Sequence, residues 1–228
     1  MKYLNNNKFC VVDITSSGQV PGFHDLIEIC IVPVTSGILP DKSVMPFSVF
    51  MEPKNLQNAQ PYSGYLAEYM KYAMNPWDAA ASFERWYEKL KLKGNKRIFP
   101  ISFNWSAKQH FIMDWLSHSE DGQPFYYDFF DTFRCIDLVT LPLYWNAVLL
   151  GNGDRCVFTR QTFTNLCTRF GIEWIKPLTA QTRCFLMLEI YRKFTEAALL
   201  GGNPLPLKEI TPIDYSEYED DPQVLDDL

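Results

Sequence analysis

The sequence predicts an α/β domain in which helices flank a mixed β-sheet. Three short apolar runs rich in β-branched residues come first, and segments with helical spacing of apolar residues then alternate with further short apolar runs. The resulting order is three strands, then helix, strand, helix, strand and two helices, which is typical of a sheet covered by helices. With 228 residues, 47% of them hydrophobic, the chain is long enough for one such core and does not belong to the disordered class.

The first three strands are expected at Lys8–Ile14, Leu26–Val34 and Pro46–Met51. Turn-forming residues around Gly18 and Gly22 separate the first two runs, so we expect these strands to pair antiparallel. Two further strands are expected at Arg97–Phe103 and near Phe133–Asp137.

The first long helix is expected to begin at Pro76 and to end before Gly94. It has proline in its first turn, acidic residues early and lysines late, which suits the helix dipole. The remaining helices are expected at Ser106–Ser117, Leu138–Leu149, Thr159–Phe170 and Thr179–Leu200.

We expect a single domain over residues 1–203 and an acidic tail over residues 204–228. The net charge is −6, but the segment Glu209–Leu228 contains eight acidic residues and no Lys or Arg, which leaves about +2 for the rest. The acidic balance therefore does not exclude nucleic-acid binding by the body of the chain. No apolar run is long enough to cross a bilayer, and the six cysteines show no CxxC spacing. These features predict a cytoplasmic protein with free thiols and no membrane association.

Three motifs resemble those of the DnaQ-like 3′–5′ exonucleases of the DEDDh class. VVDITSSG at Val11–Gly18 is similar to their first motif, an Asp-x-Glu on the first strand followed by Thr-Thr-Gly. FNWSAKQHFI at Phe103–Ile112 resembles the second motif, and LTAQTRC at Leu178–Cys184 resembles the third, which opens the last long helix. The resemblance covers about residues 8–200 and implies an RNase H-like fold.

The resemblance also implies a chemistry in which four carboxylates hold two divalent ions and a histidine acts as general base. At those family positions this chain has Asp13, Thr15, Lys108, Leu178 and Arg183. Four carboxylates would carry a charge of −4, whereas Asp13, Lys108 and Arg183 together carry +1. Because one unit-charge pair is worth roughly 4 kcal/mol at ~4 Å and an effective dielectric of ~20, two divalent ions cannot be retained there. The resemblance thus predicts the fold of an exonuclease without its catalytic set.

We interpret Asp13 as an ion-pair partner of Lys108 and Arg183. The two cations bind a nucleic-acid phosphate, neutralise the former pocket internally, or do both at once. Asn104 and Trp105 of the second motif are the further candidate binding residues. Trp105 either stacks on a terminal base or fills the emptied pocket.

Three functions remain open from the sequence. The first is an inactive exonuclease relative, without a cofactor, that binds single-stranded DNA or RNA or a protein partner. The second is an active nuclease with a relocated Mg²⁺ or Mn²⁺ site, built from Asp13 with Asp128, Asp131, Asp137 or Glu189. The third is a structural or inhibitory subunit whose acidic tail imitates nucleic acid. The sequence does not specify the oligomeric state.

Overall fold

A computed structural model describes residues 8–35, 38–54, 65–92, 96–117, 126–131, 133–153, 155–156, 158, 162–173 and 178–199. The chain divides into two compact units. Unit 1 comprises Met1–Asp137 and Lys176–Leu188, and unit 2 comprises Leu138–Ile175 and Glu189–Leu228. The domain limits expected from the sequence stay a prediction, and the acidic segment 204–228 lies outside the described residues.

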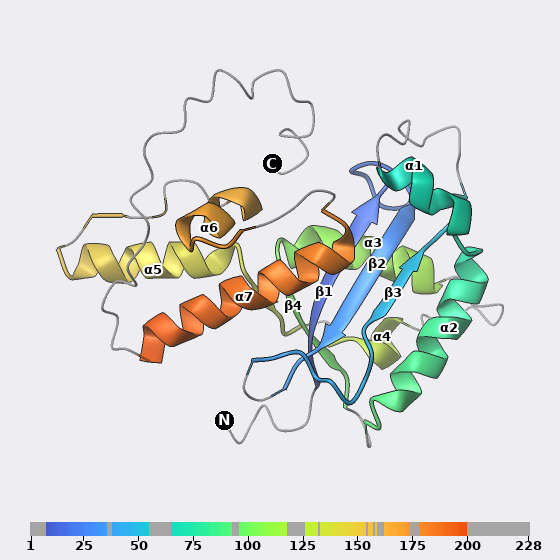
Figure 1. Ribbon diagram of the computed structural model, residues 1–228, viewed down its shortest axis with the longest axis horizontal. Helices are drawn as coiled ribbons and strands as arrows, with labels where there is room; N and C mark the ends of the chain where they lie inside the picture. Colours follow the sequence, from blue (N-terminus) through green and yellow to red (C-terminus); the bar gives the residue numbers. More distant parts are fainter. Residues whose placement is uncertain are drawn as a thin grey trace. The chain divides into compact units, whose positions relative to one another are not determined.

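Unit 1 is built on a five-stranded mixed sheet with strand order β3-β2-β1-β4-β5 (Figure 1). The strands are β1 (Lys8–Ser16), β2 (Leu26–Pro33), β3 (Phe47–Phe50), β4 (Ile98–Ser102) and β5 (Ile136–Asp137). β1 pairs antiparallel with β2 and parallel with β4, while β2 pairs antiparallel with β3, and β4 parallel with β5. The predicted mixed sheet flanked by helices is therefore confirmed.

Helices of unit 1 cover the face of the sheet to which Cys10, Val12 and Ile14 point. They are α2 (Pro76–Lys89), α3 (Trp105–Ser117) and α4 (Tyr126–Phe129). The short helices α1 (Tyr65–Tyr69) and η1 (Met70–Tyr72) precede α2, and the ring of Tyr69 stacks on that of Phe50 of β3. The other face, with Val11, Asp13 and Thr15, meets the first turns of α7 (Ala180–Leu199).

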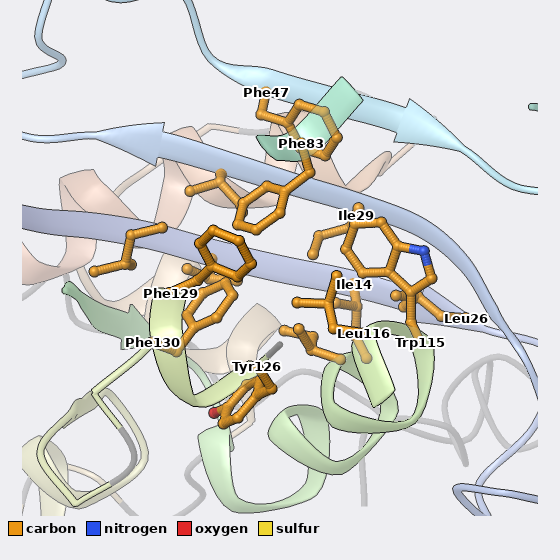
Figure 2. Close-up of a cluster of buried hydrophobic side chains, with 14 of the residues drawn as sticks. Ile14, Leu26, Ile29, Phe47, Phe83, Trp115, Leu116, Tyr126, Phe129 and Phe130 are labelled. Atoms are coloured by element: carbon orange, nitrogen blue, oxygen red, sulfur yellow. The ribbon is translucent and has the colours of Figure 1, made fainter. Parts of the chain in front are cut away.

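Aromatic side chains fill the core between the sheet and α2, α3 and α4. Phe83 of α2 lies at the centre, with its ring centroid 5.0 Å from that of Phe129, 5.5 Å from Phe47 and 5.8 Å from Trp115 (Figure 2). Such aromatic pairs add about 0.5–1.5 kcal/mol each beyond the burial of their area. The aromatic residues of this cluster therefore serve packing, which holds the sheet rigid beneath the candidate site.

Some element boundaries differ from those expected. α1 and α4 were not predicted, because helices of five and four residues are too short to show a helical period. The last strand covers Ile136–Asp137 alone, since the Asp131 side chain instead accepts hydrogen bonds from the backbone N–H groups of Phe133 and Arg134.

Unit 2 has a small aromatic core of its own. It contains α5 (Thr140–Gly151), α6 (Phe163–Arg169) and the second half of α7. Phe194 of α7 lies between Trp145, Phe158 and Phe170, with ring centroids 6.3, 5.6 and 4.9 Å away. α6 is capped by Thr162 rather than by Thr159, which lies outside the described residues. No helix in the described parts of the chain combines the length and the hydropathy of a membrane span.

Candidate functional site

The candidate site is centred on Asp13, the sixth residue of β1. Because side chains alternate along a strand, Asp13 points to the same face as Val11 and Thr15, where α7 begins. Its side chain is only 1% exposed. A carboxylate buried to this extent requires charged or hydrogen-bonding partners.

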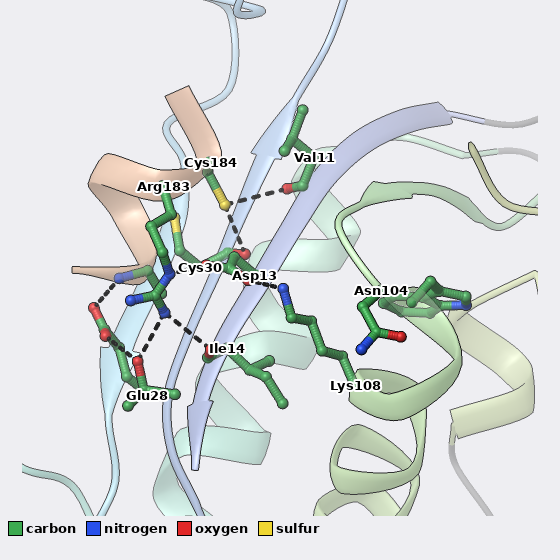
Figure 3. A network of polar contacts seen from close by, with 12 residues as sticks. Val11, Asp13, Ile14, Glu28, Cys30, Asn104, Lys108, Arg183 and Cys184 are labelled. Carbon is green, nitrogen blue, oxygen red and sulfur yellow. Dashed lines mark hydrogen bonds and ion pairs between the residues drawn. The ribbon is translucent and has the colours of Figure 1, made fainter. Parts of the chain in front are cut away.

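Both oxygens of the Asp13 carboxylate are paired with cations (Figure 3). Lys108 Nζ of α3 donates to Oδ1 at 2.5 Å, and Arg183 Nε of α7 donates to Oδ2. Burial by itself would raise the pKa of Asp13, but the Arg183 guanidinium and the Lys108 ammonium outweigh it and hold the pKa below its usual range. The predicted contact between Asp13 and the two cations is confirmed.

Arg183 also binds backbone and side-chain oxygens around Asp13. Nη1 donates to the carbonyl oxygen of Leu178 at 2.5 Å, and Nη2 donates to the carbonyl oxygen of Ile14 and to Oγ1 of Thr15, both at 2.9 Å. With Nε on Asp13, all three guanidinium nitrogens are engaged within the protein. Arg183 therefore fastens the start of α7 to the central strand.

The network continues through Glu28 of β2, which is fully buried. Thr15 stands opposite Glu28 in the β1–β2 ladder, and its hydroxyl donates to Oε2 of Glu28 at 2.9 Å. The backbone N–H of Ala180 donates to Oε1 at 2.9 Å, so Glu28 caps the N-terminus of α7. Burial raises the pKa of Glu28 despite these hydrogen bonds.

Asp137, the last residue of β5, is a second carboxylate that caps a helix, in this case the N-terminus of α3. Its two carboxylate oxygens accept from the backbone N–H groups of Asn104 and Trp105, each at 2.9 Å. Asn104 has a positive φ of 58°, which turns the chain sharply from β4 into α3. This cap fixes the helix that carries Lys108.

Trp105 and Asn104 differ in accessibility. Trp105 is 3% exposed, and its ring packs in the core with its centroid 6.1 Å from that of Phe130. This burial leaves no open ring face for a base, and the ring belongs to the core cluster with Cys10 and Val12 rather than to the pocket around Asp13, which Lys108 and Arg183 occupy instead. Asn104 is exposed. Leu178, at the family's histidine position, contributes its backbone carbonyl to Arg183.

The side chains in the pocket do not fit two divalent cations. Mg²⁺ and Mn²⁺ prefer anionic oxygen ligands, whereas the positions around Asp13 hold an ammonium group, a guanidinium group and a hydroxyl. Across the described residues, no group of three or more His, Cys, Asp or Glu side chains is arranged to hold a metal ion. No catalytic step through a metal ion is derived from this donor set.

Of the four acidic residues considered beside Asp13 for a relocated metal site, Asp131, Asp137 and Glu189 have partners within the protein. Asp137 caps α3, and Asp131 binds the side chain of Arg134 as well as the turn that follows it. Asp128 is exposed on α4. Glu189 belongs to unit 2 and is paired with Arg192.

Sequence reasoning missed the capping roles of Glu28 and Asp137. In both cases a carboxylate on one strand accepts hydrogen bonds from backbone N–H groups at the N-terminus of a helix that is distant in the sequence. Glu28 and Ala180, for example, are 152 residues apart. A signal was present for Asp137, because an acidic residue at the end of a parallel strand lies next to the helix that follows the neighbouring strand.

Comparisons by sequence and by structure give different results. No family model and no curated protein matches the sequence. Among solved structures, the zinc-bound E. coli exonuclease I in complex with single-stranded DNA matches with a TM-score of 0.60, at 12% identity over 86% of this chain and 42% of that one. Cell-death related nuclease 4 matches with a TM-score of 0.58, at 13% identity over 83% of this chain and 64% of that one.

A full-length 3′-exonuclease matches with a TM-score of 0.57, at 11% identity over 85% of this chain and 83% of that one. The chain thus spans less than half the length of exonuclease I but most of the length of this smaller enzyme. At these identities the likeness concerns the fold, and the resemblance found in the three motifs is confirmed at that level. The chain has the RNase H-like fold of the DnaQ-like 3′–5′ exonucleases.

Proposed function

We propose that this chain is a catalytically inactive relative of the DnaQ-like exonucleases that acts by binding, with nucleic-acid ends or a protein partner as its target. The observation that carries the proposal is the pairing of both Asp13 oxygens with Lys108 and Arg183. The family's reaction needs carboxylate oxygens free to hold metal ions, and here the one carboxylate that matches the family is neutralised by side chains of the same chain.

The substitution of leucine at the family's histidine position also removes the general base. Leu178 cannot accept a proton from water, and its backbone carbonyl is bound to Arg183. The cationic groups do more than fill the space left by the metal ions, because they tie α3 and α7 to β1 through direct contacts. The network therefore preserves the fold of the pocket without the activity.

The kind of target is supported by what similar structures bind. E. coli exonuclease I has been captured with single-stranded DNA, an exonuclease I with SSB-Ct, and a 3′-exonuclease with a histone mRNA stem-loop. In this chain the Lys108 side chain is 20% exposed and the Asp13–Lys108–Arg183 cluster carries a net charge of +1. A terminal phosphate can approach Lys108 from the solvent side as a second anion beside Asp13.

The test combines an activity assay with a binding assay. Incubation of the full chain with a 3′-labelled single strand in Mg²⁺ or Mn²⁺ is expected to leave the strand intact. Metal-dependent trimming that Asp13→Ala abolishes, in a variant that remains folded at the temperature of the assay, would overturn the proposal and favour a relocated metal site.

Binding is measured with fluorescent single strands at low salt. Lys108→Ala is expected to weaken binding of the strand, whereas Lys89→Ala, at an exposed lysine at the end of α2, serves as the matched control and is expected to have a smaller effect. If the wild type binds no strand, a protein partner becomes the target and the nucleic-acid form of the proposal fails. A cytoplasmic location is part of the proposal, and cell fractionation tests it.

A further inference from the structure

The outer face of α5 is apolar and exposed. The helix contains no Asp, Glu, Lys or Arg. Its inner side buries Trp145 and Leu149 within unit 2. The opposite side carries four apolar residues, of which three are large and strongly exposed: Leu143 (49%), Tyr144 (70%) and Leu150 (59%), with the exposed Ala147 between them.

A surface helix normally carries charged or polar residues on its solvent side, and a helix that is apolar all round is normally buried. Contiguous exposed apolar residues mark contact surfaces more often than isolated ones do. Leu143, Ala147 and Leu150 follow the helical spacing i, i+4, i+7, so they form one continuous stripe with Tyr144 beside it. This stripe is called the α5 face below.

We propose that the α5 face is the contact between two copies of this chain. Its lack of charge requires an equally uncharged partner surface, because a charged group placed against it would be desolvated without a counter-ion. A second α5 face meets this requirement. The inference concerns unit 2 and is independent of the proposed function, which rests on the Asp13 pocket in unit 1.

The order of side chains suits a two-fold axis. In an antiparallel helix pair related by a two-fold axis, facing residues lie on the same flank of the contact, one before and one after the axis, so an axis at Ala147 places Leu143 opposite Leu150 of the second copy. It also places Tyr144 over Gly151 of the second copy, where the absence of a side chain leaves room. The small side chain of Ala147 at the crossing point lets the two helices approach closely. Large residues thus meet complementary partners on both sides of the axis.

The size of the contact predicts a modest affinity. A helix of 12 residues is about 18 Å long, and one such pair buries less than the roughly 1,000 Å² typical of the smallest stable interfaces. We therefore expect a reversible dimer with a dissociation constant on the order of micromolar.

Sedimentation velocity of the full chain tests the dimer. Across about 1 to 100 micromolar protein, a range that brackets the expected constant, the wild type is expected to shift from monomer to dimer. Leu150→Glu is expected to stay monomeric, because it buries a charge on each side of the axis. Leu39→Glu is the matched control, since Leu39 is 56% exposed and lies in unit 1, and it is expected to dimerise like the wild type.

A charge-swap experiment tests the register. Leu150→Glu and Leu143→Lys are each expected to be monomeric alone, and a mixture of the two is expected to form a heterodimer, detected by native mass spectrometry. Recovery of association in the mixture also shows that both variants are folded.

Several outcomes overturn the proposal. They are a wild type that remains monomeric at the highest concentration, a dimer that survives Leu150→Glu, and a mixture of the charged variants that does not associate. A monomer in which α5 cross-links to another segment of the same chain assigns the α5 face to that segment instead.

Discussion

Replacement of Asp13 by Asn probes the central network with little change of shape. The Asp13→Asn side chain keeps the size of the carboxylate but loses its charge, which leaves the Lys108 ammonium and the Arg183 guanidinium next to each other without an anion between them. These two side chains are 20% and 21% exposed, so water reaches them only in part. We expect a less stable protein.

The size of the effect follows from burial. Removal of one partner of a buried ion pair costs about 3–5 kcal/mol, because the other charge is left uncompensated. Asp13 is 1% exposed, but both cations keep some contact with water, so we expect the lower end, about 3 kcal/mol. For a chain of 228 residues this corresponds to a melting temperature lower by about 6–12 °C.

Urea denaturation followed by tryptophan fluorescence measures this loss. Lys108→Met is expected to cost less, about 1 kcal/mol, because Asp13 keeps Arg183 and Lys108 is partly solvated. In the double variant Asp13→Asn/Lys108→Met the costs are expected not to add, since removal of the second charge relieves the repulsion. A free energy of unfolding for Asp13→Asn within about 0.5 kcal/mol of the wild type would refute the reasoning and indicate a hydrated pocket.

The remaining predictions concern acidic groups and metal ions. Burial raises the pKa of Glu28, so the contribution of this group to stability is fully present below its unfolded pKa of about 4.3 and declines as the pH rises through its folded pKa. Melting curves recorded across this pH range are expected to show the decline in the wild type and to lack it in Glu28→Gln. Asp137→Ala leaves the N-terminus of α3 uncapped and is expected to lower the free energy of unfolding in urea by about 1–2 kcal/mol, with Asp137→Asn in between. A chelator is expected to leave the melting temperature unchanged, and a fall of several degrees that Mg²⁺ restores would contradict the metal-free pocket. Truncation after Lys208 is expected to tighten binding of single-stranded oligonucleotides and to steepen its salt dependence, whereas equal affinity at low salt would exclude competition by the acidic segment.

Long, continuous patterns made much of the fold predictable from the sequence. β1, β2 and α7 have apolar runs or helical periods of eight residues or more. The order of the three motifs that resemble the exonucleases predicts that Asp13, Lys108 and Arg183 lie together. The charge balance of those three residues then predicted their ion pairs.

The remaining features depend on contacts between distant segments. Glu28 caps α7 because the β1–β2 register sets it opposite Thr15, and a register is not visible in a sequence of alternating apolar residues. The exposed side of α5 was equally hidden, since a helix that is apolar on all sides has no periodicity to show which side is covered.

Titration of the full chain with Mn²⁺, followed by electron paramagnetic resonance of the free ion, tests the central claim most directly. Under the proposed function, Lys108 and Arg183 occupy, on the Asp13 carboxylate, the places that metal ions would hold in an active enzyme of this fold. The account predicts no saturable Mn²⁺ binding to the wild type and a gain of binding in the variant Thr15→Glu/Lys108→Asp/Arg183→Asp, which restores four carboxylates. Saturable binding of Mn²⁺ to the wild type that is lost in Asp13→Asn would contradict the account.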